Sequence, residues 1–270
     1  MEAQAVKLIQ DTALLAHAKP LDTYTPTLVL QADQKIHSIE KFQLLRSRFR
    51  GELVTHSLHD FGNYVQHHTT EAAAVGFVDA EQMRCTVYFN LGDITEPGHG
   101  DFTATLNLRK TAGFVALERA AGSTFQQKDL SDWIEDWAPN LVSLAADDSP
   151  IDLRKAANAI RSISIEQARK SEHVVGDLSA SRSAMDQIEA KSSEGLPAEF
   201  RFTVEPYEGL TARTIRLRVA VLTGGEKPLL KLRWIGEEQL REDLAQEFKQ
   251  VVQADVGTAA TLTIGSFKLA

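Results

Sequence analysis

The sequence predicts an α+β protein in which antiparallel sheets carry packed helices. In several short stretches apolar residues alternate with polar ones, which is typical of antiparallel strands with one buried face. Around these stretches apolar residues recur at three- and four-residue spacing, which indicates amphipathic helices. The pattern predicts two mixed segments joined by a helical arm.

Composition and charge exclude several classes of protein. The 270 residues can bury a large core, in one domain or two. A net charge of −8 argues against a protein that coats nucleic acid by bulk charge. The single cysteine, Cys85, excludes an internal disulfide and fits a reducing cytosol. The N-terminal residues lack a basic signal sequence, and no apolar run approaches the ~20 residues of a membrane span, so we expect a cytoplasmic protein without a membrane partner.

The first half of the chain holds two predicted parts. Residues 1–24 form an N-terminal helical arm, because Val6, Ile9, Ala13 and Ala16 share one helical face and Pro20 ends it. Residues 25–146 form an α+β segment. Its predicted strands are 27–31, 75–77, 85–91 and 102–108, and its predicted helices are 58–67, 110–121 and 129–137.

The second half is predicted as an arm and a further segment. Residues 147–195 begin with a loop at 147–150 and continue as a polar helical arm over 151–191. Residues 196–270 contain the clearest alternation, at 200–204, 215–221 and 230–234. A hairpin turn at 223–228 joins the last two strands, and a helix around 240–251 and a strand at 261–267 follow.

The motif PGHGD at residues 97–101 ends a stretch rich in histidine. Gly98 and Gly100 provide the backbone freedom of a tight turn, and Asp101 can fix the tautomer of His99, which together predict a structural pair. The alternative is a metal or catalytic site. Its candidate ligands are His56, His59, His99 and Asp101. No spacing among them matches a metal signature, so the structural interpretation is favoured and no cofactor is expected.

A second set of residues is basic. In the C-terminal strands, the positions opposite the apolar face include Arg201, Arg216, Arg218, Lys231 and Arg233. Alternation places them on one side of a sheet, where they could bind phosphates or an acidic surface of a neighbouring subunit, or simply face water. No aromatic residue lies between these basic positions, which weakens the case for a single-strand nucleic-acid site.

Several segments, taken in order, resemble the YfdQ-like proteins, a family of unknown function found in temperate phages and bacterial prophages. These segments are residues 48–51 (RFRG), 97–101 (PGHGD), 125–126 (FQ), 135–137 (EDW) and the run from Phe202 through Pro206 and Tyr207 to Leu222-Thr223-Gly224. The resemblance covers most of the chain. Family members often carry cysteine where this chain has Gly100, which lowers any metal interpretation that relies on a thiol. The resemblance implies a phage or prophage protein acting in a bacterial cytoplasm, and it carries over no catalytic residues.

Three functional hypotheses follow. The first is a non-enzymatic, self-associating protein that acts through protein–protein contacts, with itself and with a host or phage protein, in an assembly such as a ring or shell. The second is a nucleic-acid-handling accessory protein of phage replication or recombination that uses the basic residues. The third is a metal-dependent enzyme centred on His99 and Asp101. The chain contains no nucleotide-binding or hydrolase signature, which favours a non-enzymatic role.

Overall fold

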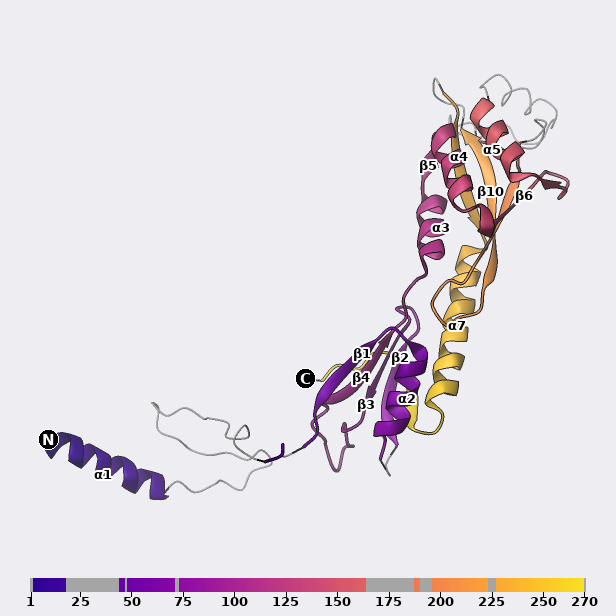
Figure 1. Ribbon diagram of the computed structural model, residues 1–270. Helices are drawn as coiled ribbons and strands as arrows, with labels where there is room; N and C mark the ends of the chain where they lie inside the picture. The colour runs from indigo at the N-terminus through magenta and orange to yellow at the C-terminus, as the bar shows by residue number, and fades with distance from the viewer. Residues whose placement is uncertain are drawn as a thin grey trace, which may run out of the picture. The chain divides into compact units, whose positions relative to one another are not determined.

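The chain divides into two units, which are described separately. The computed structural model describes residues 2–17, 44–46, 48–70, 73–163, 187–189, 196–222 and 227–269. The first unit, Met1–Phe49, contains helix α1 (Glu2–His17). The second unit, Arg50–Ala270, contains two sheets with helices packed on them, which confirms the predicted α+β fold class (Figure 1).

One sheet of the second unit is mixed, and we call it the mixed sheet. Its strand order is β1-β4-β3-β2-β12. The strands are β1 (Gly51–Thr55), β2 (Ala74–Asp79), β3 (Arg84–Tyr88), β4 (Phe102–Asn107) and β12 (Ala260–Ile264). The three central strands are antiparallel, whereas β1 and β12 run parallel to their neighbours. Parallel pairing needs long connections, and helices α2 (Leu58–His68) and α7 (Glu237–Val256) lie in those connections.

Helices α2 and α7 cover one face of the mixed sheet. Phe61 and Val65 of α2 and Phe248 and Val252 of α7 are fully buried. The helices approach closely at Gly62, where a Cβ would lie 3.1 Å from Asp255 Cβ. The predicted alternation in β3 and β4 is confirmed. The strand residues buried under these helices include Val78, Cys85, Val87, Ala104 and Leu106.

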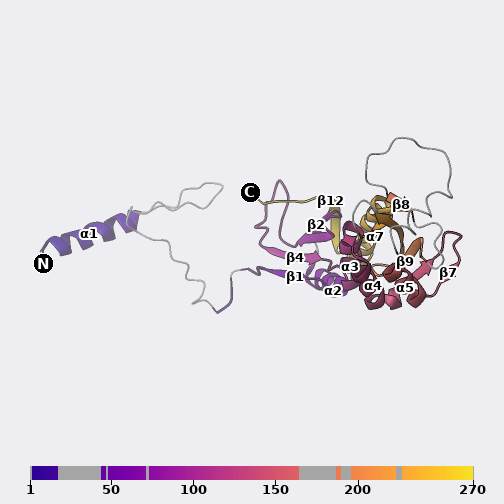
Figure 2. The same ribbon diagram turned by 90° about the horizontal axis from the view of Figure 1, so that it is seen from above.

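The other sheet is wholly antiparallel, and we call it the antiparallel sheet. Its order is β5-β11-β10-β9-β6-β7, with β8 also paired to β10. The strands are β5 (Thr124–Phe125), β6 (Leu141–Leu144), β7 (Pro150–Ile151), β8 (Gln187–Glu189), β9 (Glu199–Val204), β10 (Arg213–Leu222) and β11 (Leu229–Ile235). Helices α3 (Ala112–Gly122), α4 (Gln127–Asp136) and α5 (Leu153–Ser162) group together beside it (Figure 2).

These three helices pack on the apolar face that the alternation predicts. Phe202 of β9 and Leu217 of β10 are fully buried. The indole of Trp133 stacks on Phe202 with ring centroids 5.7 Å apart, and Phe114 contacts Trp234 edge to face at 5.9 Å. The aromatic side chains of α3 and α4 therefore hold both helices against the sheet.

Strand pairing crosses the predicted segment boundaries. Strand β12 belongs to the predicted segment 196–270, yet it pairs with β2 of segment 25–146. Strands β5 and β6 belong to segment 25–146, yet they pair with β11 and β9. Helix α7 connects the two sheets and so allows β12 to join the mixed sheet. Its 20 residues span about 30 Å, starting after β11 and ending beside β12.

The predicted helical arm over 147–195 contains only one described helix, α5. Residues 187–189, which we predicted as helix, instead form strand β8. Strand β9 pairs with β10 only along residues 213–218, and β8 takes the remaining edge at residues 220–222. The predicted strand 27–31, the middle of the arm at 164–186 and turn residues 223–226 lie outside the described residues. Among the described helices, none combines the length and the apolar content that crossing a bilayer requires.

Because α7 carries the core of the mixed sheet, truncating one of its fully buried side chains should be costly. We expect Phe248→Ala to lower the free energy of unfolding by about 3–5 kcal/mol, since it removes a buried ring and leaves a cavity. Chemical denaturation followed by circular dichroism measures this loss. The control is Gln250→Ala on the exposed side of the same helix, which should change stability by less than about 0.5 kcal/mol.

Candidate functional site

The PGHGD motif closes a hairpin extension between β3 and β4, which we call the finger (residues 89–101). Two backbone hydrogen bonds join its sides. The Gly98 N–H donates to the Leu91 carbonyl at 2.8 Å, and the Gly100 N–H donates to the Asn90 carbonyl at 3.0 Å. An isolated bridge between Gly92 and Pro97 extends this pairing toward the tip. The motif is therefore one side of a paired, ordered projection.

A side-chain clamp fixes the base of the finger. The Asn90 amide donates to Asp101 Oδ1 at 2.9 Å, and its carbonyl oxygen accepts the Phe102 N–H at 3.0 Å. The predicted structural pair of His99 with Asp101 is not formed. His99 is exposed, and among the described residues no hydrogen bond joins it to Asp101. Asp101 is instead hydrogen-bonded by Asn90, which lies directly across the hairpin from it.

The two glycines of the motif are required for steric reasons. A Cβ at Gly98 would collide with the carbonyl oxygen of Asn90. Gly100 has φ +61°, and a Cβ there would lie 2.6 Å from Leu269 Cδ1 of the C-terminal tail. The predicted need for backbone freedom therefore has two distinct causes, a close backbone approach at one position and a left-handed conformation at the other.

The tip of the finger is ordered by one carboxylate. Asp93 Oδ1 accepts hydrogen bonds from the Thr95 N–H at 2.7 Å, the Thr95 hydroxyl at 2.6 Å and the Glu96 N–H at 2.8 Å. These bonds, the Thr95 hydroxyl first, lower the pKa of Asp93. Ile94 lies between Asp93 and Thr95 in the sequence and is fully exposed, at 101%. Sequence reasoning missed Ile94, although an Asp-x-Thr turn with an apolar middle residue was the available signal.

The candidate metal ligands do not come together at one site among the described residues. The described residues contain no group of three or more histidine, cysteine, aspartate or glutamate side chains that could hold a metal ion. His56 Nδ1 lies 2.6 Å from the Asn107 carbonyl, and His59 bonds to Asn63 within α2. Asn107 ends β4, whereas His99 lies just before that strand begins. His56 and His99 are therefore separated by the length of β4.

The five basic residues, Arg201, Arg216, Arg218, Lys231 and Arg233, lie on one face of the antiparallel sheet, which we call the basic face. The register pairs Arg216 with Arg201 and Arg218 with Arg233. Their strand neighbours Phe202, Leu217 and Leu232 point to the opposite, helix-covered side. Placing so many cations side by side would be unfavourable without a compensating charge.

That compensating charge is Glu199, which sequence reasoning missed. Glu199 lies on the same face and is only 6% exposed. Arg216 donates to both of its carboxylate oxygens, at 2.9 and 2.7 Å, and Arg201 approaches at 3.5 Å. Arg201 also lies 3.6 Å from Asp148. Hydrogen bonding from Arg216, followed by the charges of Arg216 and Arg201, lowers the pKa of Glu199 against the opposing effect of burial.

The ion pairs change what the basic face can do. A bidentate arginine–carboxylate pair fixes both side chains and uses two of the N–H donors that a phosphate could bind. Arg216 thus forms a bidentate pair with Glu199, and Arg201 lies within ion-pair distance of the same carboxylate. The basic face is therefore an internally compensated surface around a buried carboxylate, which weakens its case as a phosphate-binding site.

Replacing Gly98 should loosen the finger. In Gly98→Ala the new methyl group meets the Asn90 carbonyl, so we expect a stability loss of about 2 kcal/mol and faster amide exchange across residues 89–101. Hydrogen exchange with mass spectrometry measures both effects. Gly122→Ala is the control, because no atom lies within 4 Å of its added Cβ. Equal exchange in the two variants would contradict the steric requirement.

The Glu199 ion pair should make stability depend on pH. Because its pKa is lowered from the ordinary 4.5, the pair contributes fully above that value and is lost as pH falls through the lower folded-state pKa. We expect Glu199→Gln to cost about 1–3 kcal/mol at neutral pH and to flatten the acid limb of the stability curve. Urea midpoints measured from neutral pH into the acid limb test this. The exposed Glu238→Gln should keep the parental curve.

Comparison with known proteins places the chain in a family without assigning it an activity. Neither the curated proteins nor the solved structures that were searched contain a match. A family model described as Uncharacterized conserved protein (DUF2303) matches residues 2–267, which is nearly the whole chain and includes the finger, both sheets and α7. The chain therefore belongs to this family of uncharacterized conserved proteins.

Proposed function

We propose that this protein acts through protein–protein contacts and self-associates, with the finger presenting Ile94 to a second copy. The observation that carries the proposal is the full exposure of Ile94 at the tip of a hydrogen-bonded turn. Burying an isoleucine side chain in an interface contributes about 1.5–3 kcal/mol. A rigid turn loses little conformational entropy on binding, so more of this energy appears as affinity.

Helix α1 gives separate support for self-association. Its apolar residues Val6, Leu8 and Ile9 are exposed by 53%, 68% and 68%. Most of the stability of a short amphipathic helix comes from packing of its apolar side chains against another surface. A second copy of the chain supplies such a surface at the concentration of the protein itself. Repeated contacts of this kind close into a ring or a shell when symmetry permits.

The setting that we propose is a bacterial cytoplasm, with the protein encoded by a phage or prophage. The resemblance of several segments to YfdQ-like proteins supports this origin, and the single, buried Cys85 fits a reducing compartment. Burial raises the pKa of the Cys85 thiol to about 12, so the thiol is unsuited to act as a nucleophile.

We place a nucleic-acid-handling role second, because Arg201 and Arg216 are engaged by Glu199.

Changing Ile94 should weaken assembly without unfolding the protein. We expect Ile94→Ser to raise the dissociation constant of the oligomer by at least about tenfold, because the contact loses its apolar anchor. Light scattering over a dilution series measures the mass of the assembly. Ile94→Val should retain the parental mass, and Val142→Ser should too, because this half-exposed residue lies on the antiparallel sheet rather than on the finger. A parent protein that remains monomeric at high concentration would refute self-association.

A further inference from the structure

A short segment lies on the face of the mixed sheet that is turned away from α2 and α7. Val78 and Val87 are buried under these helices. Phe77 and Tyr88 are their neighbours along the strands, so both rings point to the opposite face. Residues 265–269 follow β12 and reach these two rings, and we call this segment the strap.

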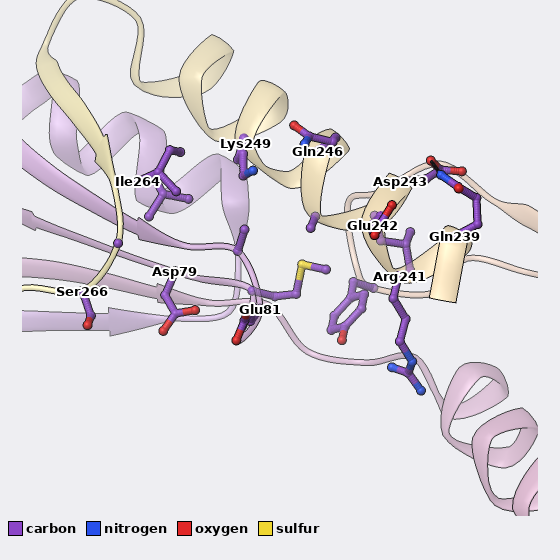
Figure 3. Close-up of a pocket in the computed structure, with 17 residues that line it drawn as sticks. Asp79, Glu81, Gln239, Arg241, Glu242, Asp243, Gln246, Lys249, Ile264 and Ser266 are labelled. Carbon is purple, nitrogen blue, oxygen red and sulfur yellow. Dashed lines mark hydrogen bonds between the residues drawn. The ribbon is translucent and has the colours of Figure 1, made fainter. Parts of the chain in front are cut away.

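The strap begins where β12 ends. The Gly265 N–H donates to the Val78 carbonyl at 2.9 Å, and Gly265 has φ +135°, a conformation that glycine adopts at little cost. Figure 3 shows Ile264 and Ser266, the residues before and after this glycine, at a surface cavity that Asp79 also lines. At Gly265 the chain therefore leaves the edge strand of the mixed sheet.

Phe267 anchors the strap on the sheet. Its ring stacks on Phe77 with the centroids 4.8 Å apart and an interplanar angle of 11°, and it meets Tyr88 edge to face at 5.7 Å. Both arrangements of aromatic rings are favourable beyond the area that they bury. Because Phe77 lies on β2 and Tyr88 on β3, this one side chain contacts two strands.

Leu269 brings the strap to the base of the finger. A Cβ at Gly100 would lie 2.6 Å from Leu269 Cδ1 and 3.1 Å from Cδ2, so the leucine side chain packs against the bare backbone of the glycine. Gly100 is buried, and its N–H forms one of the hydrogen bonds that join the two sides of the finger. The strap thus connects β12, at the edge of the sheet, with the base of the finger.

The contacts of the strap leave much of its apolar surface in water. Phe267 is 40% exposed and Leu269 is 49% exposed. Segments that bury little apolar surface open locally at a small part of the free energy of global unfolding. Docking of the strap is therefore an equilibrium that a single substitution can shift while the sheet stays folded.

We propose that the strap positions the finger for the self-association proposed above, with Leu269 as the positioning residue. When the strap is docked, Leu269 supports the backbone at Gly100, so the finger presents Ile94 in one direction. When the strap lifts, this support is lost and only a fraction of the fingers is competent to bind. The apparent dissociation constant rises as that fraction falls. The inference rests on the proposed function and adds a contact that regulates the same site.

Hydrogen exchange of the full chain tests the support of the finger. The measurement uses the Ile94→Ser background, so that protection by assembly does not contribute. Adding Leu269→Ser should speed exchange across residues 89–101 by at least about threefold and leave α2 and α7 unchanged. Phe267→Ser should act in the same way, because it removes the anchor of the strap. Lys268→Ser is the matched control, since this exposed residue lies between the two and should leave exchange unchanged.

Light scattering over a dilution series, with Ile94 intact, tests the effect on assembly. We expect Leu269→Ser to raise the dissociation constant of the oligomer by about three- to tenfold. Leu269→Met keeps an apolar side chain of similar volume and should retain the parental value. Lys268→Ser should retain it too. A residue that only stabilised the fold would instead speed exchange in α2 and α7 as well.

The two measurements separate failure of this inference from failure of self-association. Unchanged exchange of the finger on adding Leu269→Ser would overturn the strap as its support, while assembly of the parent would still stand. A parent that stays monomeric would refute self-association and, with it, the control of assembly by the strap. Tighter assembly in Leu269→Ser would also overturn the proposal, because the strap would then act as a cover.

Discussion

The fold of the second unit depends on the burial of one side of helix α7. Leu244, Phe248, Val252 and Val256 form a continuous apolar stripe that is almost fully buried. Figure 1 shows α7 leaving the antiparallel sheet and reaching the mixed sheet beside α2. Because β12 follows α7 directly, the same helix delivers the last strand to the edge of the mixed sheet. The two sheets are thus parts of one folding unit.

The start of α7 is held by charges in addition to the packing of Leu240 against the core. Arg241 pairs with Glu237 one turn earlier and with Glu118 of α3, and its guanidinium lies 5.5 Å from the centroid of the Trp234 ring. Glu118 also binds Lys110 at 2.8 Å. These contacts tie α7 to the helix layer of the antiparallel sheet. They also engage the guanidinium of Arg241.

Satisfied polar groups shape both the finger and the basic face. In the finger, hydrogen bonds of Asn90 join the base of the hairpin, and hydrogen bonds of Asp93 order its tip around the exposed Ile94. On the basic face, the buried Glu199 orders two arginines.

The sequence by itself determined the local structure. Alternation identified the buried faces at Cys85 and Val87 and again at Leu217 and Val219. When one face of a strand is buried, apolar residues recur at every second position of the sequence. The sequence predicted a tight turn at PGHGD, but these residues form one paired side of the finger, and the turn itself lies at residues 93–96. Only the tertiary structure decided which strands share a sheet, that residues 187–189 pair with β10, and that Asp101 binds Asn90. It likewise decided that Glu199 lies among arginines. These contacts join residues far apart in the chain or across a hairpin, and the periodicity of a single segment carries no information about its partner.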